Sequence, residues 1–486
     1  MEQQNTFLLE APLGKLMRGY AVPCIISLLT AALYNVVDQI FIGWGVGAAG
    51  NSATNIVFPL TVLALAVATM IGDAACSFVS IRMGCGDHQS ASRAVGNAVV
   101  LAVAAGLVLT AVYFLWDNQI LWLFGANDNL DSATRQYAGE YFFWISAGIP
   151  VYMFGQAMNP IIRSDGSPRL AMAATVAGAA ANVVLDPIAI FCFHWGVAGA
   201  AVATVAGQVI TAVISLGYLF RMKLIHLTRE SFLVRWKLVA QFIPLGFTSF
   251  LSQFSLVLSM MTMNNMVARY GAVSAFTTDS TATIPMAVLG IVMKFYQIVI
   301  SVVVGMAAGC IPVVGFNYGA MCYGRCRKMM RLLLWTEAAV GAVALVLFQV
   351  FPVQLISIFG TDNSPLYFDF AKLAFRMYLC MMLLDCVNKA AFIFLQSLGK
   401  PVESTLLSLL REVVLSIPLA ILLPWAAAGI WGEVNGIYGL LASMPCAALL
   451  TFLAAVYIIL RTDRQLHRQE AGTCGNRMPE KHSEDV

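Results

Sequence analysis

The chain has 486 residues, of which 60% are apolar and 11% are charged, and its mean hydropathy is +0.80. Soluble domains are about one quarter charged, so this composition excludes an ordinary water-soluble enzyme. The formal net charge of +3 is too small, and its charges too scattered, to indicate nucleic acid as a partner. We therefore expect an all-α protein of a bacterial-type inner membrane.

Apolar runs between polar breaks predict twelve membrane spans, because each crossing needs about 20 residues. The polar, acidic start MEQQNTFLLE lacks the pattern of a cleavable signal peptide, so the first span is expected to stay attached. In chain order, the predicted spans cover residues 16–44, 52–81, 94–116, 137–162, 169–193, 197–220, 238–268, 274–314, 332–351, 371–398, 402–424 and 434–460.

Basic residues predict the orientation of these spans. Connections after even-numbered spans are rich in them, as in Arg325–Arg331, whereas connections after odd-numbered spans offer Arg135, Arg269 and Lys372. The positive-inside rule then places both termini in the cytoplasm. Residues 461–486 are expected to form a disordered cytoplasmic tail.

A repeat divides the chain into two halves. Ile161–Pro168 resembles Phe394–Pro401 at a shift of 233 residues, and Gly86 meets Gly319 at the same shift. Each half, 1–220 and 238–460, holds six spans, and a basic linker, 221–237, joins them. Because six is even, the two six-helix bundles insert in the same orientation and should be related by a pseudo-two-fold axis along the membrane normal. Such a pair suits alternating access to a central site.

Ionisable side chains inside a span cost about 2.5–3.5 kcal/mol on insertion scales, so each is a candidate for function. Asp38 lies in the first predicted span and Asp186 in the fifth. Asn182 precedes Asp186 by four residues, which puts both oxygen-bearing side chains on one helix face. With Thr204 of the sixth span, they are expected to bind a proton or a small hard cation such as Na⁺. The alternative is that they only satisfy a helix kinked at Pro187.

Most other charges within spans fall in the second half. Asp385 and Lys389 are four residues apart, which favours a local ion pair of structural or functional value. The remaining charged residues of the spans are candidates by the same argument, and they are Asp73, Asp279, Lys294, Glu337, Arg411 and Glu412.

Several motifs resemble those of the multidrug and toxic compound extrusion family, the MATE transporters. The matching segments spread over both halves and are Tyr34–Gly43, Arg163–Pro168, Asn182–Pro187, Gly196–Thr204 and Pro312–Gly319. The resemblance implies two six-helix lobes in a V shape, and export driven by an inward proton or sodium gradient.

Two branches of that family make different predictions. The DNA-damage-inducible F type has an aspartate in the first span, Asn-x-x-x-Asp in the fifth and a threonine in the sixth, which look like Asp38, Asn182, Asp186 and Thr204. The NorM branch has a glutamate in the seventh span, where this chain has Gln253, and an aspartate in the tenth, near Asp385. The resemblance therefore implies cation coupling in the amino-terminal lobe.

The expected cargo is an amphipathic small molecule such as a drug, toxic compound or metabolite. Apolar, adaptable walls accept varied ligands, although aromatic and Met residues on a span equally suit core or lipid-facing positions. The residues expected to line the binding region are Tyr34, Asn35, Tyr152, Met153, Gln156, Gln253, Met293 and Asp385.

Two other functions fit the sequence less well. A lipid-linked oligosaccharide flippase would need a cationic cleft for pyrophosphate, for which Lys294, Lys389 and Arg411 are the support. An enzyme is not expected, because the five histidines are isolated and the sequence contains neither a P-loop nor a hydrolase motif. We expect a monomer with the lipid bilayer and a small-molecule substrate as partners, no cofactor beyond the coupling H⁺ or Na⁺, and no other metal.

Overall fold

A computed structural model describes residues 8–124, 132–276, 283–357 and 365–475, which form helices joined by short connections. The first half of the chain contributes six long segments, and the short helix α5 (Asp117–Leu123) follows the third. These segments are α2 (Leu13–Gly45), α3 (Ala48–Gly84), α4 (His88–Leu115), α6 (Ser132–Ser164), α7 (Pro168–Pro187) continued by the π-helix η1 (Ile188–Cys192), and α8 (Gly196–Leu219).

The second half repeats this order. Its segments are α9 (Trp236–Gly271), α10 (Thr283–Gly319), α11 (Tyr323–Val350), α13 (Pro365–Tyr378) with α14 (Met382–Ser397), α15 (Pro401–Leu409) with the π-helix η3 (Leu410–Leu415) and α16 (Ser416–Trp431), and α17 (Gly436–Gly475). The short helix α12 (Pro352–Ser357) follows α11, and the axis bends by 45° between α13 and α14.

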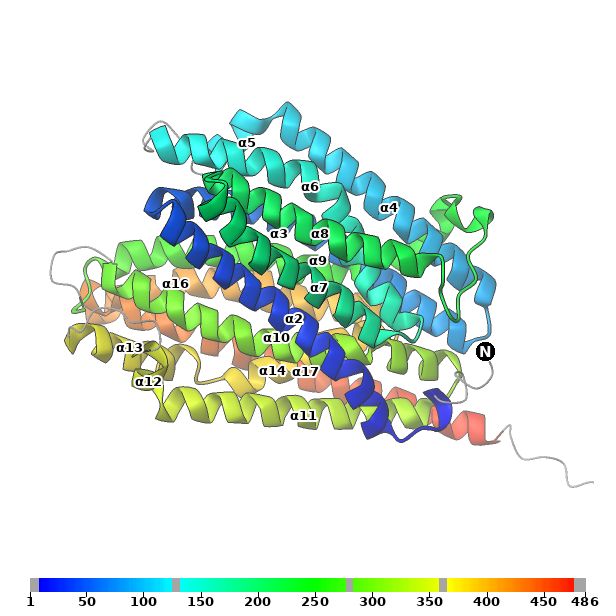
Figure 1. Cartoon of the computed structure of the whole chain (residues 1–486). Coiled ribbons are helices and arrows are strands. Elements are labelled where there is room, and N and C mark those ends of the chain that lie inside the picture. Colours follow the sequence, from blue (N-terminus) through cyan, green and yellow to red (C-terminus); the bar gives the residue numbers. More distant parts are fainter. Residues whose placement is uncertain (1–7, 125–131, 277–282, 358–364, 476–486) are drawn as a thin grey trace, which may run out of the picture.

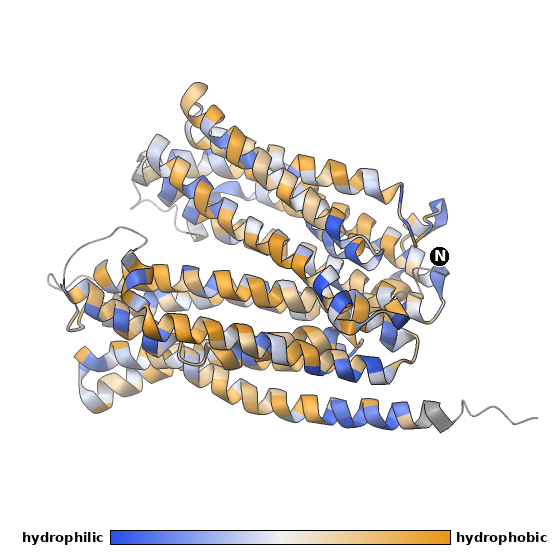
Figure 2. Ribbon diagram, turned by 60° about the horizontal axis from the view of Figure 1, so that its bottom comes forward, coloured by the Kyte–Doolittle hydropathy of each residue, from blue (hydrophilic) through white to orange (hydrophobic). Residues whose placement is uncertain are grey.

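Among the described residues, ten helices are long and apolar enough to cross a membrane, and α13 with α14 makes an eleventh. The remaining long segment, α6, contains Arg135, Glu140 and Arg163 and packs against α3, α4 and α8. Figure 2 shows apolar residues along most of the length of the helices. The predicted twelve segments are therefore all present.

The repeated motif builds the same turn in both halves. Gly166 and Gly399 adopt left-handed backbone conformations, with φ of 79° and 69°, which favours glycine. Each N–H donates to the carbonyl three residues earlier, on Arg163 and on Gln396 respectively, at 3.1 Å. Pro168 and Pro401 then occupy the first turn of the next helix, where the missing N–H of proline costs nothing. The residues that revealed the repeat thus join equivalent pairs of segments.

The two six-segment lobes meet through equivalent helices. α2 packs on α10, and α3 packs on both α9 and α10. A Cβ added to Gly84 would lie 2.1 Å from the carbonyl oxygen of Phe316, and one added to Gly319 would lie 2.0 Å from that of Ile81. These reciprocal contacts are those expected near a pseudo-two-fold axis. The lobes converge at the end of the molecule where the N-terminus is marked and diverge at the other (Figures 1 and 2).

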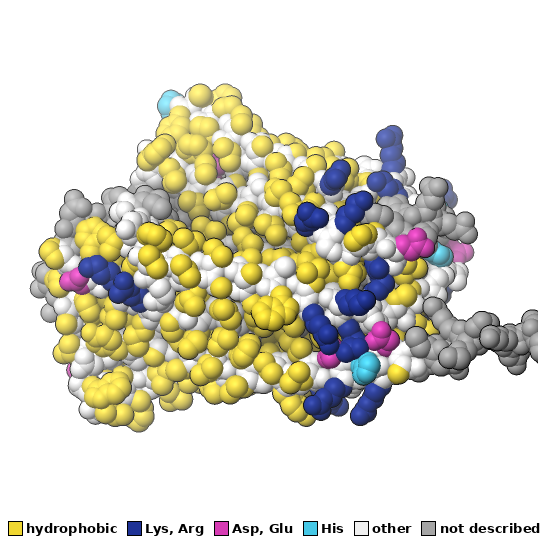
Figure 3. Space-filling view, turned by 90° about the horizontal axis from the view of Figure 1, so that it is seen from below, with side chains coloured by type: hydrophobic (Ala, Val, Ile, Leu, Met, Phe, Trp, Pro, Cys, Tyr) yellow, Lys and Arg dark blue, Asp and Glu magenta, His cyan; other side chains and the backbone are white. Residues whose placement is uncertain are grey.

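Basic side chains gather at the end where the lobes converge (Figure 3), which we call the basic end. It is where α3 and α10 finish and α4 and α11 begin. Asn317 and Arg325 donate hydrogen bonds to the carbonyl of Leu8 there, at 3.2 and 3.3 Å, and hold the start of the chain. Both ends of the described chain lie at this end, because α17 finishes beside the start of α11.

The expectation of a disordered tail from residue 461 is wrong as far as Gly475. α17 continues to that residue, and Leu466 on it is buried. Arg327 on α11 pairs with Asp463 at 3.1 Å and with Glu470 at 3.0 Å, which fixes this extension against the second lobe. Residues 476–486 lie outside the described chain.

The linker between the lobes is fixed to the first one. The buried carboxylate of Asp165 accepts hydrogen bonds from the backbone N–H groups of Lys223, Leu224 and Ile225 at 2.6–3.0 Å, and from the hydroxyl of Tyr218 at 2.6 Å. Multiple N–H donors make a buried carboxylate tolerable. The linker is therefore an ordered part of the amino-terminal lobe for at least its first residues.

Candidate functional site

Three helices of the first lobe bring the four predicted coupling residues together. Asn182 on α7 donates from Nδ2 to Oδ1 of Asp186 at 3.1 Å and to Oγ1 of Thr204 on α8 at 3.2 Å. The carboxyl groups of Asp38 on α2 and Asp186 lie within hydrogen-bonding reach of each other. Asp38, Asn182 and Asp186 are buried, with exposed fractions of 6%, 2% and 0%. The structure therefore brings the four predicted residues together.

Several oxygen atoms of this cluster lack a hydrogen-bond donor. Among the described residues, Oδ1 of Asp38, Oδ1 of Asn182 and Oδ2 of Asp186 have no hydrogen-bond partner. Buried acceptors are costly when left unpaired, and two facing carboxylates repel each other. A proton or a hard cation between them satisfies both requirements, because each supplies positive charge to oxygen acceptors.

Close packing of α7 on α8 positions Asn182 and Thr204. A Cβ added to Gly178 would lie 2.6 Å from the carbonyl oxygen of Gly207, and one added to Gly207 would lie 2.5 Å from that of Gly178. The two backbones therefore cross almost in contact, and the side chains one turn away meet. α7 continues through Pro187 and widens into the π-helix η1, a feature frequent at functional sites.

Tyr141 lies near the cluster although it was not among the predicted residues. This buried tyrosine on α6 interacts electrostatically with Asp38, Asp186 and Tyr34. Tyr141 lies within an ordinary aromatic stretch of a predicted span, so sequence spacing alone does not single it out.

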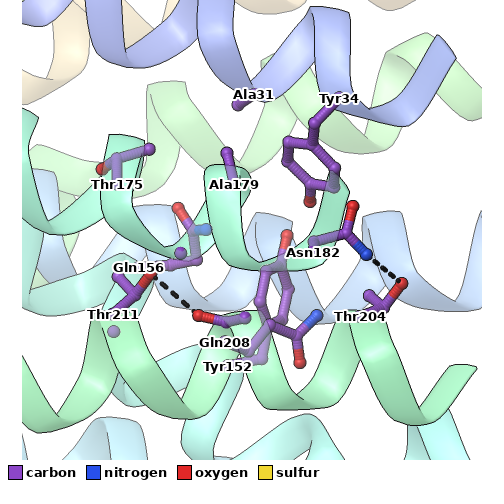
Figure 4. A pocket seen from close by; sticks show the side chains of 13 residues that line it. Ala31, Tyr34, Tyr152, Gln156, Thr175, Ala179, Asn182, Thr204, Gln208 and Thr211 are labelled. Carbon is purple, nitrogen blue, oxygen red and sulfur yellow. Dashed lines mark hydrogen bonds between the residues drawn. The ribbon is translucent and has the colours of Figure 1, made fainter. Parts of the chain in front are cut away.

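A pocket opens beside this cluster, between α2, α6, α7 and α8 (Figure 4). Tyr34, Tyr152 and Gln156 line it, as predicted for the binding region, and Asn182 and Thr204 form part of its wall. The other lining residues are Ala31, Gly155, Thr175, Gly178, Ala179, Gly207, Gln208 and Thr211. Polar side chains line the pocket along its length, and all of its lining residues belong to the first lobe.

The structure places the other predicted binding residues elsewhere. Met153 is fully buried in an apolar cluster, and Asn35 is exposed, with its amide bonded to the carbonyl of Ala31 at 2.8 Å. Gln253 is half-buried on α9. Met293 lies in the second lobe, where its sulfur accepts from the hydroxyl of Tyr378 at 3.4 Å. The first-lobe pocket is therefore smaller than the binding region predicted from sequence.

The charges within the second lobe pair between helices. Arg411 on η3 binds Asp385 on α14 with N···O distances of 2.8–2.9 Å, and Tyr296 donates to the same carboxylate at 2.6 Å. Lys389 pairs with Glu412, the next residue of η3. The predicted local pair between Asp385 and Lys389 is therefore wrong. The π-helix η3 presents the consecutive residues Arg411 and Glu412 to α14. Asp385 and Lys389 of α14 therefore each meet an opposite charge on η3 and do not pair with each other.

Asp73 contributes to the contact between the lobes. Its carboxylate lies 3.8 Å from the guanidinium of Arg163 and accepts a hydrogen bond from Ser249 of the second lobe at 2.8 Å. Gln396 on α14 donates to the same serine hydroxyl at 3.3 Å. Asp73 therefore joins the lobes and lies outside the Asp38 cluster. Asp279 lies outside the described residues.

Known transporters resemble this chain over nearly its whole length. It is 21% identical to the multidrug export protein MepA of Staphylococcus aureus (strain MRSA252), over 94% of this chain and 96% of that protein. Its structure is similar to that of the MATE multidrug transporter DinF-BH in complex with rhodamine 6G, at 29% identity and a TM-score of 0.82, over 94% of this chain and 97% of that one.

A multidrug resistance MATE family transporter in an outward-facing conformation matches with a TM-score of 0.83 and 22% identity, over 94% of this chain and 98% of that one. Solved MATE structures have 12 helices in two bundles, which confirms the predicted architecture. The MatE family model matches residues 23–188 and 248–422, one segment in each lobe. The chain belongs to the MatE family, as its motifs predicted.

Proposed function

We propose that the chain is a secondary active transporter that exports amphipathic small molecules from the cell in exchange for H⁺ or Na⁺. The observation that carries the proposal is the buried cluster of Asp38, Asn182, Asp186 and Thr204, with three oxygens that lack a donor among the described residues. Such a group is stable with one positive ion bound and costly without it. Binding and release of that ion can therefore drive a conformational change.

The packing of the lobes supports alternating access. They are in close contact at the basic end, through Gly84, Gly319 and the hydrogen bond between Asp73 and Ser249. The positive-inside rule assigns the basic end to the cytoplasm and both termini with it. In the inferred orientation this conformation is closed to the cytoplasm, and export requires a second conformation in which these contacts separate.

The pocket and the relatives support small-molecule cargo. The pocket beside the cluster combines Tyr34, Tyr152 and Gln156, so it offers aromatic surface together with hydrogen-bonding groups. MepA is a multidrug export protein and DinF-BH was solved with rhodamine 6G. We infer that this chain likewise carries substrates of this class, as a monomer.

The alternative of a lipid-linked oligosaccharide flippase has less support. Pyrophosphate recognition needs basic side chains that can turn to the ligand. Arg411 and Lys389 are instead engaged by Asp385 and Glu412 within the second lobe. These two bases therefore contribute no excess positive charge of the kind that a pyrophosphate would require.

The experiment that tests the proposed function is transport by the purified protein in liposomes. Proton and sodium gradients are imposed separately, and the movement of rhodamine 6G and of a fluorescent anion is followed. We expect rhodamine 6G to move against one of the two ion gradients and to stop when that gradient is collapsed. Transport that continues without any gradient would contradict coupled export.

Gln253→Ala is expected to lower this transport by less than about tenfold, which is the largest effect expected from the loss of one neutral hydrogen-bonding group. Gln253 is half-buried on α9, away from the carboxylate cluster of the first lobe. Its replacement removes no titratable group. Initial rates of rhodamine 6G transport, normalised to the amount of protein in the liposomes, measure the effect. Complete loss of transport in this variant would move the coupling site to the second lobe.

A further inference from the structure

A carboxyl group in the second lobe has no role in the function proposed above. Glu337 lies halfway along α11, a helix of 28 residues, and is fully buried with an exposed fraction of 0%. Neither of its carboxyl oxygens has a hydrogen-bond partner among the described residues. A buried carboxylate is normally paired or bonded, so this side chain requires an explanation.

Two thiols lie on the helices beside Glu337. A Cβ added to Gly341, one turn along α11, would lie 3.2 Å from Sγ of Cys386 on α14, and Cys310 lies on α10, which also packs against α11. The same Cβ would lie 2.7 Å from Cα of Leu383, so α11 and α14 leave no room for water there. Thiols are weak donors and carry no positive charge when protonated. These thiols therefore offer nothing that stabilises an ionised carboxylate.

The ion pairs and hydrogen bonds that charged residues of α13 and α17 make with α11 lie far from Glu337. The acids of α17 meet Arg327 and Arg331, which precede Glu337 by ten and six residues on α11. On α13, Arg376 bonds the carbonyl of Gln349 near the opposite end of α11. Neither set of charges reaches the middle of α11.

The remaining neighbouring helices also bring no base to this position in the described part of the chain. Cys24 on α2 belongs to the same buried apolar cluster as Ala308 and Ile311 of α10, and the helix α12 has no ionisable residue. Lys294 on α10 precedes Cys310 by more than four helical turns, which is about 24 Å along the axis. Glu337 is therefore surrounded by apolar groups and thiols.

The buried charges of the second lobe balance only if Glu337 is neutral. Its buried charged residues, among those described, are three acids and two bases. Arg411 pairs with Asp385 and Lys389 pairs with Glu412, which leaves Glu337 as the third acid. An excess negative charge in this low-dielectric interior is highly unfavourable.

We propose that Glu337 is a proton-binding site of the second lobe, separate from the Asp38 cluster, and that it carries its proton in this conformation. The ligand is the proton itself, because the described residues include no group of acids, histidines or cysteines around Glu337 that could hold a metal cation. The site does not depend on the function proposed for the first lobe. It stands whether or not Asp38 and Asp186 couple export to an ion.

Infrared spectroscopy of the purified protein in liposomes at neutral pH tests this site. We expect Glu337→Gln to remove one C=O band of a protonated carboxylic acid, and expect the matched variant Glu433→Gln to remove none, because Glu433 is exposed on η4 (Glu433–Asn435). The same band should persist when Asp38 and Asp186 are both asparagine, which separates it from the first-lobe site. If Glu337→Gln has the same infrared bands of protonated carboxylic acids as the wild-type protein, the proposal is wrong.

A second variant keeps the test decisive if Glu337→Gln fails to fold. Glu337→Asp retains a carboxyl group in the same apolar surroundings, so it should keep one protonated-acid band at a shifted frequency. The band should also persist to higher pH than the bands of exposed carboxyl groups, because ionisation would leave an unpaired buried charge. A carboxylate band in place of the acid band, in either the wild-type protein or Glu337→Asp, would show that the site is ionised and contradict the proposal.

Discussion

Asp38→Asn and Asp186→Asn are each expected to abolish ion-driven export while the protein still inserts and folds. Asparagine keeps the shape of the side chain but removes the titratable group and the negative charge that hold the coupling ion. Each variant leaves one aspartate beside the neutral oxygens of Asn182 and Thr204, so the pair of facing carboxyl groups is lost. Transport of rhodamine 6G in liposomes with the driving ion gradient imposed measures the effect, and the expected rate is that of liposomes without protein.

A matched substitution controls for the general effect of replacing Asp by Asn. Asp117 is exposed at the start of α5 and bonds the backbone N–H of Asn118 at 2.7 Å. Asp117→Asn should therefore transport rhodamine 6G at the wild-type rate. Normal transport in both Asp38→Asn and Asp186→Asn would refute the assignment of coupling to the first lobe.

Arg411→Ala is expected to destabilise the second lobe strongly. Arg411 and Asp385 have exposed side-chain fractions of 2% each, so removal of the guanidinium leaves a buried carboxylate that still accepts from Tyr296 but has lost its counter-ion. Loss of one partner of a buried ion pair typically costs about 3–5 kcal/mol. Thermal unfolding in detergent measures the change, and the unfolding temperature should fall by several degrees.

Two further variants distinguish the destabilisation caused by an unpaired buried charge from that caused by the loss of side-chain contacts. Arg331→Ala removes a guanidinium whose side chain is 62% exposed and pairs with Asp463 at 3.4 Å, so it should change stability by less than about 1 kcal/mol. The double variant with Arg411→Gln and Asp385→Asn removes both charges and should be more stable than Arg411→Ala alone. If the double variant is no more stable, then the ion pair is not what holds η3 against α14.

Much of the fold could be predicted from the sequence because the membrane imposes it. Long apolar runs have few alternatives to helices in a bilayer, and the repeat indicated the number of segments in each half. The break between α13 and α14 was not predicted, since the run around Leu379–Met381 is apolar throughout. The helical extension of α17 was also missed. Its residues are polar, and the acids that stabilise it find their partners on α11, which is distant in sequence.

The site was predictable where it depends on the residue types within spans and on their spacing. Asn182 and Asp186 share a face of α7, Asp38 is an acid inside a span, and the family resemblance implied the same group together with Thr204. Partners that depend on packing between helices were not predictable. Asp385 and Lys389 have the spacing of a local pair, yet each binds a residue of the π-helix η3, whose backbone geometry no sequence pattern indicated. The places of Tyr141 and Met153 depend in the same way on how α6 is rotated.

Gly84 contacts Phe316 and Gly319 contacts Ile81 so closely that a single added methyl group would push the two lobes apart. An alanine at either glycine has no space for its side chain unless the neighbouring backbone withdraws. The clash is relieved if the two lobes separate at the basic end. Under the alternating access proposed above, adding one methyl group at either glycine is therefore expected to favour the second conformation.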